Sequence, residues 1–268
     1  MAEFVLCVDV GNSRTKVGLF EHEPVPGGGA ELPECLAAAA ITHGQAVRWD
    51  KLRRELNVQR TDGVRGFVAG SSPESVAVIR HGWPVDWAAP LLLDDVSRFP
   101  LEIRLDAPNH AGVDRILNAV ACNVIRPPGT PSLIVDTGTA TTVDAVSPEG
   151  AFEGGAILPG FELCARALNQ YTAQLPFVTI DELCNESHEP LGTNTREALR
   201  SGLLWGQIGA IRELVQRLSA RWEAAPFVLL TGGGAPLAAS DLPEAHWEPC
   251  LSLQGLAVVA AHMTKDAP

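Results

Sequence analysis

The stretch LIVDTGTATTVDAV, residues 133–146, decides the fold class of this chain. A short apolar run ends in Asp-x-Gly, several hydroxyl residues follow, and a second β-rich run begins directly after them. Residues 4–20, FVLCVDVGNSRTKVGLF, have the same arrangement at the start of the sequence. Apolar runs on both sides of a small polar turn are typical of two strands joined by a hairpin. Two such units predict an internal duplication in which both copies share one task.

The order of the other elements predicts two α/β domains. Six helices are expected, at residues 46–58, near residues 73–80, and at residues 112–125, 161–175, 191–222 and 251–263. Residues 132–160 predict a run of three strands, with turns at 148–150 and 154–155. Strands followed by helices therefore occur twice. We expect domains at residues 1–111 and 112–268 and, because no long linker separates them, a ligand in the cleft between them.

Composition excludes several classes of function. The 268 residues carry a net charge of −12, which argues against a general nucleic-acid or anionic-membrane binder because phosphate polymers would be repelled. No apolar stretch reaches the length of about 18 residues expected of a spanning helix, so we expect a cytoplasmic protein. The six cysteines form no C-x-x-C pair, and we expect them to be reduced and structural.

The two Asp-x-Gly turns suit a polyphosphate. Glycine brings backbone N–H groups close to phosphate oxygens, and a carboxylate at a strand end can hold Mg²⁺, which prefers oxygen ligands. Asp9 and Asp136 are these carboxylates, although a plain hairpin turn explains either loop equally well when it is taken alone. LTGGGAP, residues 230–236, is a third strand that ends in glycines, which allow a base or ribose to approach. The sequence contains no P-loop motif.

Three strand-terminal glycine loops in a duplicated α/β chain resemble the actin-like ATPase superfamily, which includes acetate kinase, heat-shock 70 proteins and sugar kinases. A more specific likeness begins at PNHAGVDRILNAVA, residues 108–121. Its P-x-x-x-G-x-D-R pattern resembles the type III pantothenate kinases, the bacterial enzymes that commit pantothenate to coenzyme A. DVGNS, DTGTATT, GGAILPG, GTNTREALRSG and LTGG fit that family too, in its order and over nearly the whole chain. The resemblance implies an actin-like two-domain fold with ATP in the interdomain cleft.

On the nucleotide side, the resemblance makes residues 9–16 the first phosphate loop. Asp9 would help to place Mg²⁺ indirectly and Lys16 would lie near the phosphates, while Asp136 would bind the K⁺ or NH₄⁺ that the family requires. The ATP-binding residues expected in this way are Asp9, Val10, Gly11, Asn12, Ser13, Arg14, Thr15, Lys16, Thr139, Gly232 and Gly233.

On the substrate side, the resemblance assigns pantothenate to Gly112, Val113, Asp114 and Arg115, with Asp114 as the general base. Thr195 would contact pantothenate across the interface of a homodimer. Taken by themselves, an Asp-Arg pair at a helix start and a Thr before a helix are also ordinary capping residues. Leu105 departs from the family, which usually has tyrosine seven residues before the glycine of G-x-D-R and lines the pantothenate pocket with it. A leucine supplies apolar packing there but no hydroxyl.

The leading hypothesis is therefore an enzyme that phosphorylates pantothenate with ATP. The alternative from another class is a non-catalytic regulator on the same scaffold, like relatives known as transcription-activating factors. A regulator has no need to retain Asp9, Asp114 and Asp136 together, and all three are present. A nucleotide hydrolase would need water in the place of pantothenate.

Overall fold

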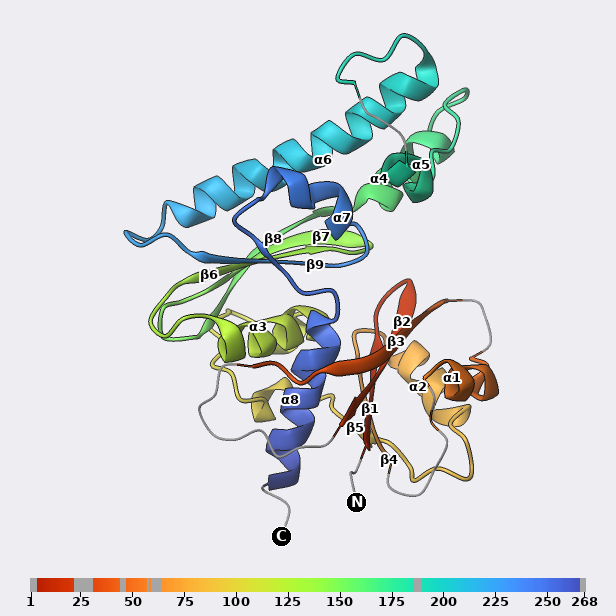
Figure 1. Ribbon diagram of the computed structural model, residues 1–268, viewed down its shortest axis with the longest axis vertical. Coiled ribbons are helices and arrows are strands. Elements are labelled where there is room, and N and C mark those ends of the chain that lie inside the picture. Colours follow the sequence, from red (N-terminus) through yellow and green to blue (C-terminus); the bar gives the residue numbers. More distant parts are fainter. Residues whose placement is uncertain are drawn as a thin grey trace. The chain divides into compact units, whose positions relative to one another are not determined.

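The computed structural model describes residues 4–21, 31–43, 47–56, 58, 64–185 and 189–265 (Figure 1). The chain divides into two compact units. The first contains the residues up to Arg126 together with those from Cys250 onward, and the second contains Pro127–Pro249. This division differs from the expected one at residues 111/112, because the helices that begin at Val113 and Leu251 pack together and against strands of the first unit.

The first unit is built on a five-stranded sheet with the order β3-β2-β1-β4-β5. β1, β2 and β3 are antiparallel, and β4 and β5 continue the sheet parallel to β1. The central strand β1 has six consecutive buried residues, as expected of a strand covered on both faces. The strands span Phe4–Val10 (β1), Arg14–Glu21 (β2), Cys35–Thr42 (β3), Val64–Gly70 (β4) and Leu91–Leu92 (β5).

Two helices of the first unit, α3 and α8, lie side by side (Figure 1). Their approach is close because Gly255 on α8 has no side chain: a Cβ atom at this position would lie 2.0 Å from the carbonyl oxygen of Leu117 on α3. α8 also contacts β1, β2 and β4. The helices of this unit are α1 (Trp49–Glu55), α2 (Pro73–His81), α3 (Val113–Ile125) and α8 (Leu251–Lys265).

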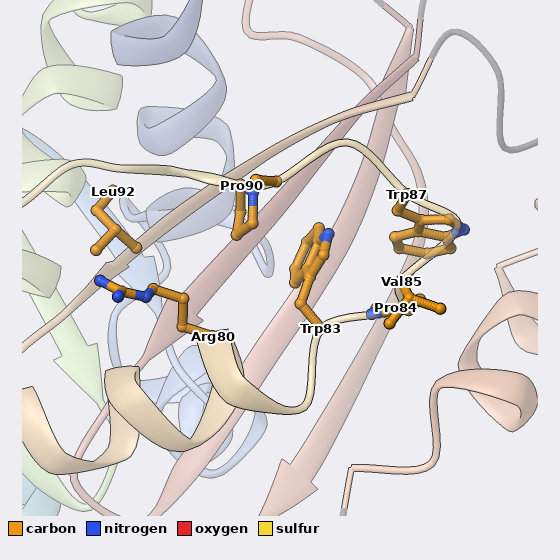
Figure 2. Close-up of a pocket in the computed structure, with 8 residues that line it drawn as sticks. Arg80, Trp83, Pro84, Val85, Trp87, Pro90 and Leu92 are labelled. Carbon is orange, nitrogen blue, oxygen red and sulfur yellow. The ribbon is translucent and has the colours of Figure 1, made fainter.

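A cluster of three tryptophans orders the segment between α2 and β5. Trp49, Trp83 and Trp87 contact one another edge to face, with ring centroids 4.9 to 5.9 Å apart. Arg53 lies 4.8 Å above the Trp87 ring and forms an ion pair with Asp86. Figure 2 shows how the second and third of these rings help to line a surface pocket of about 540 Å³. None of the residues lining this pocket belongs to the predicted motifs.

The second unit repeats the topology of the first. Its sheet has the order β10-β9-β6-β7-β8, in which β6, β7 and β8 are antiparallel and β9 and β10 run parallel to β6. Read from the other edge, this is again three antiparallel strands followed by two parallel ones, so the predicted duplication is present in the structure. The strands span Ser132–Thr137 (β6), Ala140–Val146 (β7), Phe152–Pro159 (β8), Phe227–Thr231 (β9) and His246–Trp247 (β10).

The long helix α6 covers one face of this second sheet (Figure 1). Its buried residues Ile211 and Val215 join a core with alternate residues of β6, β7 and β9. Shorter helices complete the unit, and with α6 they span Phe161–Gln170 (α4), Ile180–Asn185 (α5), Thr195–Ser219 (α6) and Ala235–Ala238 (α7).

The described residues bear on the predictions about membrane-spanning helices and about the cysteines. None of the helices in the described ranges is both long and apolar enough to cross a membrane. All six cysteines are free thiols, as expected. Complete burial raises the pKa of the Cys7 thiol far above its usual range, which leaves this side chain as a small apolar group of the core.

Candidate active site

The first Asp-x-Gly motif forms the tight connection between β1 and β2. The Gly11 N–H donates to the Arg14 carbonyl at 3.0 Å, which closes the turn. In the antiparallel register that follows, Asp9 lies directly opposite Lys16, so the two side chains share one face of the sheet. The strand pairing therefore brings together a carboxylate and an ammonium group that are seven positions apart in sequence.

A serine from α8 completes this arrangement, and the sequence analysis missed it. The Ser252 hydroxyl donates to Oδ2 of Asp9 at 2.8 Å, and Nζ of Lys16 donates to the same hydroxyl at 3.3 Å. Nζ of Lys16 lies 3.8 Å from Oδ2 of Asp9. Asp9 and Ser252 are each 2% exposed, whereas the Lys16 side chain is 40% exposed. The carboxylate is thus held inside the unit while the ammonium group faces outward.

The other residues of the predicted phosphate loop divide into two groups. The side chains of Val10 and Thr15 are buried, and the Thr15 hydroxyl lies 3.4 Å from Nε2 of His43, so these two residues can offer a ligand only backbone groups. Asn12 and Arg14 are exposed, and Gly11 and Ser13 are half-buried. The part of the loop accessible to a phosphate is therefore the turn itself and the Lys16 ammonium group.

Asp114 lies in the first turn of α3. Gly112 is the N-cap residue, and it contributes no side-chain hydrogen bond to the helix. Oδ1 of Asp114 accepts a hydrogen bond from the backbone N–H of Arg115 at 3.0 Å. Asp114 and Arg115 are half-buried, and Val113 is buried. A carboxylate in the first turn of a helix is stabilised in its ionised form by the helix dipole, and in that form it can accept a proton.

Leu105 lies in the irregular segment that leads to α3, and its side chain is half-buried. It belongs to the same unit as Asp9 and Asp114.

The second Asp-x-Gly motif joins β6 to β7, and the glycine turn after β9 packs against it. Gly232 has a φ of +91°, a backbone conformation that favours glycine. A Cβ atom at this position would lie 2.5 Å from Oδ1 of Asp136 and 2.7 Å from the backbone of Thr137. The hydroxyl of Thr137 donates to the Thr231 carbonyl at 2.9 Å, and the Gly234 N–H donates to the Thr137 carbonyl at 2.9 Å. The structure therefore brings Asp136 and Gly232 together.

Thr139 lies at the exposed tip of the same loop, where its side chain is accessible. Its carbonyl accepts a hydrogen bond from the Gly160 N–H at 3.0 Å. Gln207 of α6, which is 7% exposed, supports this corner because its Nε2 donates to the Pro159 carbonyl at 2.6 Å and contacts Sγ of Cys164 at 3.2 Å. Gln207 is a second residue that could not be predicted from the sequence, because a single glutamine within a long helix gives no signal of such a contact.

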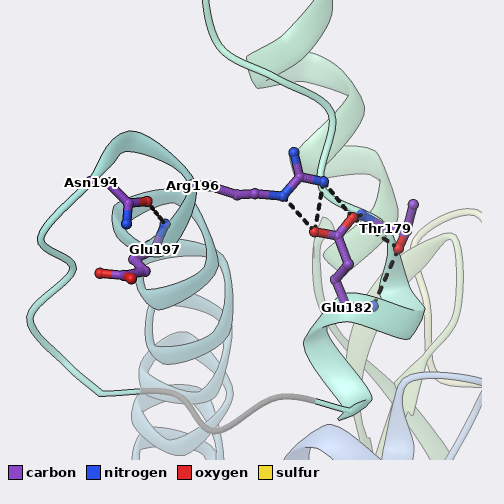
Figure 3. A network of polar contacts seen from close by, with 5 residues as sticks. All are labelled: Thr179, Glu182, Asn194, Arg196 and Glu197. Carbon is purple, nitrogen blue, oxygen red and sulfur yellow. Dashed lines mark hydrogen bonds and ion pairs between the residues drawn. The ribbon is translucent and has the colours of Figure 1, made fainter.

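Thr195 is the first residue of α6, and it is exposed. It is not the N-cap: Asn194 holds that position, with its side chain accepting the Glu197 N–H at 3.0 Å. Arg196 makes a bidentate ion pair with Glu182 of α5, shown in Figure 3, and this pair holds the pKa of the Glu182 carboxyl below its usual range. The network ties the start of α6 to α5 and leaves the Thr195 side chain accessible.

Two oxygens in these loops could hold cations. Oδ1 of Asp9 is buried, and among the residues that the structure describes it accepts no hydrogen bond. Mg²⁺ is commonly bound through one or two carboxylates, with phosphate oxygens and waters as its remaining ligands, so a single aspartate fits this role. Oδ1 of Asp136 lies beside the glycine turn after β9, 2.5 Å from where a Cβ atom of Gly232 would be, and a carboxylate oxygen can hold a monovalent cation. The described residues contain no group of three or more His, Cys, Asp and Glu arranged around a common metal position.

Solved structures share the fold of this chain. A protein from Campylobacter jejuni assigned to the Baf family of transcriptional activators superimposes with a TM-score of 0.58 at 17% identity, over 97% of this chain and 99% of that one. The activator of the 2-hydroxyisocaproyl-CoA dehydratase from Clostridium difficile, with bound ADPNP, gives a TM-score of 0.52 at 12% identity, over 100% and 98% of the two chains. The chain has the predicted duplicated actin-like ATPase fold.

Sequence comparison identifies the family. The family model described as type III pantothenate kinase matches residues 5–217. Proteins named type III pantothenate kinase from Rubrobacter xylanophilus and Dehalococcoides mccartyi are 33% and 32% identical, over 96–97% of this chain and 97–98% of theirs. The relative of that name from Caulobacter vibrioides is 37% identical over 62% of this chain, and this chain spans 63% of its length. The chain therefore belongs to the type III pantothenate kinase family.

Proposed function

We propose that this chain transfers the γ-phosphoryl group of ATP to the primary hydroxyl of pantothenate, giving 4′-phosphopantothenate and ADP. Membership of the type III pantothenate kinase family is the observation that carries the proposal. The two Asp-x-Gly turns support it, because Asp136 lies beside the backbone of the glycine turn after β9 and Asp9 lies near the end of the strand that leads into the Gly11 turn. At 17% identity, the likeness to the Baf family structure reflects a shared fold and gives no support to the regulatory alternative.

Asp114 is the proposed general base. Its carboxylate accepts the proton of the pantothenate hydroxyl as the oxygen of that hydroxyl attacks the γ-phosphorus, and the bond between the γ-phosphorus and the bridging oxygen breaks to release ADP. The backbone N–H of Arg115 donates to Oδ1 of the carboxylate at 3.0 Å and so helps to fix its orientation at the start of α3. Gly112 and Val113 would line the pantothenate pocket with Leu105, and Arg115 would bind the substrate carboxylate.

The two aspartate loops would neutralise the negative charge of the phosphates. Residues 11–16 would surround the phosphates, with the exposed Lys16 ammonium group directed to them, and Asp9 would hold Mg²⁺ directly or through water. A bound Mg²⁺ withdraws charge from the phosphate oxygens during transfer, and K⁺ or NH₄⁺ at Asp136 adds a further positive charge. Thr139 and the glycines at 232 and 233 would contact the nucleotide.

The decisive experiment measures ADP release from ATP with and without pantothenate, in Mg²⁺ buffer containing either KCl or NaCl. We expect turnover that requires both pantothenate and K⁺. Asp114→Asn should lower kcat by about 10²–10⁴, the usual contribution of a general base. The matched control is Asp50→Asn, which makes the same charge change on the exposed surface of α1 and should leave kcat unchanged.

The outcomes separate the hypotheses. Turnover without pantothenate would indicate a hydrolase or a different acceptor. A folded protein that is silent under all conditions would contradict the kinase and favour a regulator. Retention of full activity by Asp114→Asn would remove this residue from the role of base while leaving the kinase assignment in place.

We also propose that the chain forms a homodimer through the outer face of α6. Gly202, Gly206 and Gly209 lie on this face with open space around them, and Trp205 beside them is 39% exposed. Glycines at a four-residue spacing let two helices approach closely, and an exposed tryptophan is a common interface anchor. Such a contact would also bring the start of α6, with Thr195, toward a second copy.

Light scattering after size exclusion tests this contact. Gly206→Arg should convert a dimer into a monomer, whereas Val78→Arg, at an exposed position of α2 in the first unit, should not. A monomeric wild type, or a dimer that survives Gly206→Arg, would exclude this face as the interface.

A further inference from the structure

The buried hydroxyl of Ser252 has a single possible hydrogen-bond direction. Nζ of Lys16, 3.3 Å away, is an ammonium group that can only donate, so it occupies a lone pair of the hydroxyl oxygen. The proton of Ser252 is therefore directed to Oδ2 of Asp9 at 2.8 Å, and an ionised carboxylate can only accept. The order of donation runs from lysine to serine to aspartate, without an alternative arrangement.

This chain of contacts makes the two oxygens of Asp9 unequal. Oδ2 accepts from Ser252, whereas Oδ1 is equally buried and accepts no hydrogen bond from the residues in the described ranges. Leaving a buried charged oxygen without a partner is costly, so such a group indicates a missing ligand. One oxygen is thus fixed by the protein and the other is left for a cation or its bound water.

The same serine keeps the lysine away from the aspartate. Nζ of Lys16 remains 3.8 Å from Oδ2, beyond hydrogen-bond distance, because the hydroxyl lies between the two groups. A direct ion pair would neutralise the carboxylate needed for a cation and occupy the ammonium group needed for phosphates. With the serine in place, the Lys16 side chain stays 40% exposed although its partner carboxylate is 2% exposed.

We propose that Ser252 is a positioning residue of the phosphate loop: it orients Asp9 so that Oδ1 faces Mg²⁺, and it prevents Lys16 from closing on the carboxylate. This inference rests on the proposed function, since it assigns Mg²⁺–nucleotide to the loop. The first turn of α8 carries the serine, so the positive end of that helix also favours the ionised carboxylate. The residue acts through Asp9 and Lys16 and does not itself touch the nucleotide.

The test is a double-mutant cycle read by calorimetric binding of Mg²⁺–ADP. Ser252→Ala should weaken binding about 10-fold, at the lower end of the usual effect of removing a partner of a metal ligand. In the Asp9→Asn background the same change should weaken binding hardly further, because the serine acts through Asp9. Ser252→Thr retains the hydroxyl and should bind as the wild type does.

A matched control comes from the other end of the same helix. Thr264 also has a hydroxyl, but it donates to the carbonyls of Ala260 and Ala261, so Thr264→Ala should leave Mg²⁺–ADP binding unchanged. Thermal unfolding of every variant separates lost binding from lost structure.

Each outcome decides the inference. An unchanged affinity in Ser252→Ala, an equal loss in both Asp9 backgrounds, or a loss shared with Thr264→Ala would overturn the positioning role. Pantothenate-dependent ADP release by the wild type would still support the kinase in all three cases. A wild type that binds no Mg²⁺–ADP would overturn both proposals together.

Discussion

The contact between α3 and α8 makes a prediction that opposes ordinary helix propensity. A Cβ atom at Gly255 would lie 2.0 Å from the Leu117 carbonyl oxygen and 2.7 Å from its carbonyl carbon. Both neighbours are backbone atoms of a helix, so no side-chain rotation can relieve the contact. Gly255→Ala can be accommodated only if the two helices move apart.

Two opposing free-energy terms decide whether Gly255→Ala stabilises or destabilises the protein. Alanine is favoured over glycine inside a helix by about 0.8–1.0 kcal/mol, so propensity alone predicts that Gly255→Ala stabilises the protein. A carbon–oxygen contact normally measures about 3.3–3.6 Å, so the helices would have to separate by more than about 1 Å. Overpacking of this kind costs about 1–3 kcal/mol, and a backbone contact belongs at the upper end of that range. We expect a net loss of about 1–2 kcal/mol in the free energy of unfolding.

Urea unfolding followed by circular dichroism measures this loss. The companion variant is Ala257→Gly, at a buried position two residues along the same helix, which should also destabilise by about 1 kcal/mol because it replaces the better helix former. Gly255→Ala and Ala257→Gly, although opposite in kind, should therefore both lower the free energy of unfolding. A Gly255→Ala protein more stable than the wild type would refute the close approach of α3 and α8.

Three further predictions concern the second unit and the substrate side. Gly232→Ala should lower the free energy of unfolding by about 1–2 kcal/mol, because alanine is strained at this positive φ. The new methyl group would also displace the Asp136 carboxylate, so the KCl concentration needed for half-maximal turnover should rise. An unchanged KCl dependence would count against the cation role of Asp136. Arg196 lowers the pKa of Glu182, so its stabilising effect is present above the usual carboxyl range and is lost as pH falls through the depressed folded-state pKa. Arg196→Ala should be less stable than wild type at neutral pH, and thermal unfolding across pH should show this difference shrinking as the pH is lowered. Leu105→Tyr should lower KM for pantothenate by about 2- to 10-fold, because the added hydroxyl can form a hydrogen bond in the pocket; an unchanged KM would count against a place for residue 105 in it.

Both hairpins of the two sheets were predictable because their signals are local. At Asp9–Gly11 and Asp136–Gly138, apolar runs lead directly into turn residues, and the structure has β1–β2 and β6–β7 there. The helix expected at residues 112–125 is α3, Val113–Ile125, and its apolar stripe is buried. In each case the determining contacts lie within a few residues of one another.

The edge strand β3 shows where local signals fail. Residues 35–42 read CLAAAAIT, and alanine is the best helix former, yet the segment pairs with β2 and alternates between half-buried and exposed residues. Ladder hydrogen bonds to an existing strand outweigh a propensity of a few tenths of a kcal/mol per residue. No helix or strand is expected in this segment from its sequence.

The contact of Ser252 with Asp9 could not be predicted from the sequence, for a different reason. It is separated from Asp9 by 243 positions and lies in a helix whose other residues are mostly apolar. A lone serine there is indistinguishable from a small core residue until the helix is placed against β1. The boundary expected at residues 111/112 differs from the division into two compact units for a similar reason, since nothing in the local pattern of α8 indicates to which unit it returns.

The return of α8 also fixes an order of events during synthesis. β1, β2 and β4 are complete once Gly70 has been added, but the helix that packs on them begins only at Leu251. At 5–20 residues per second this interval lasts roughly 10–40 s, during which the intervening unit, whose residues are contiguous, can fold first. Asp9 remains uncovered by α8 throughout that time. A product of premature termination would carry every Asp-x-Gly and G-x-D-R motif of this chain and would still lack the hydroxyl that holds the first aspartate.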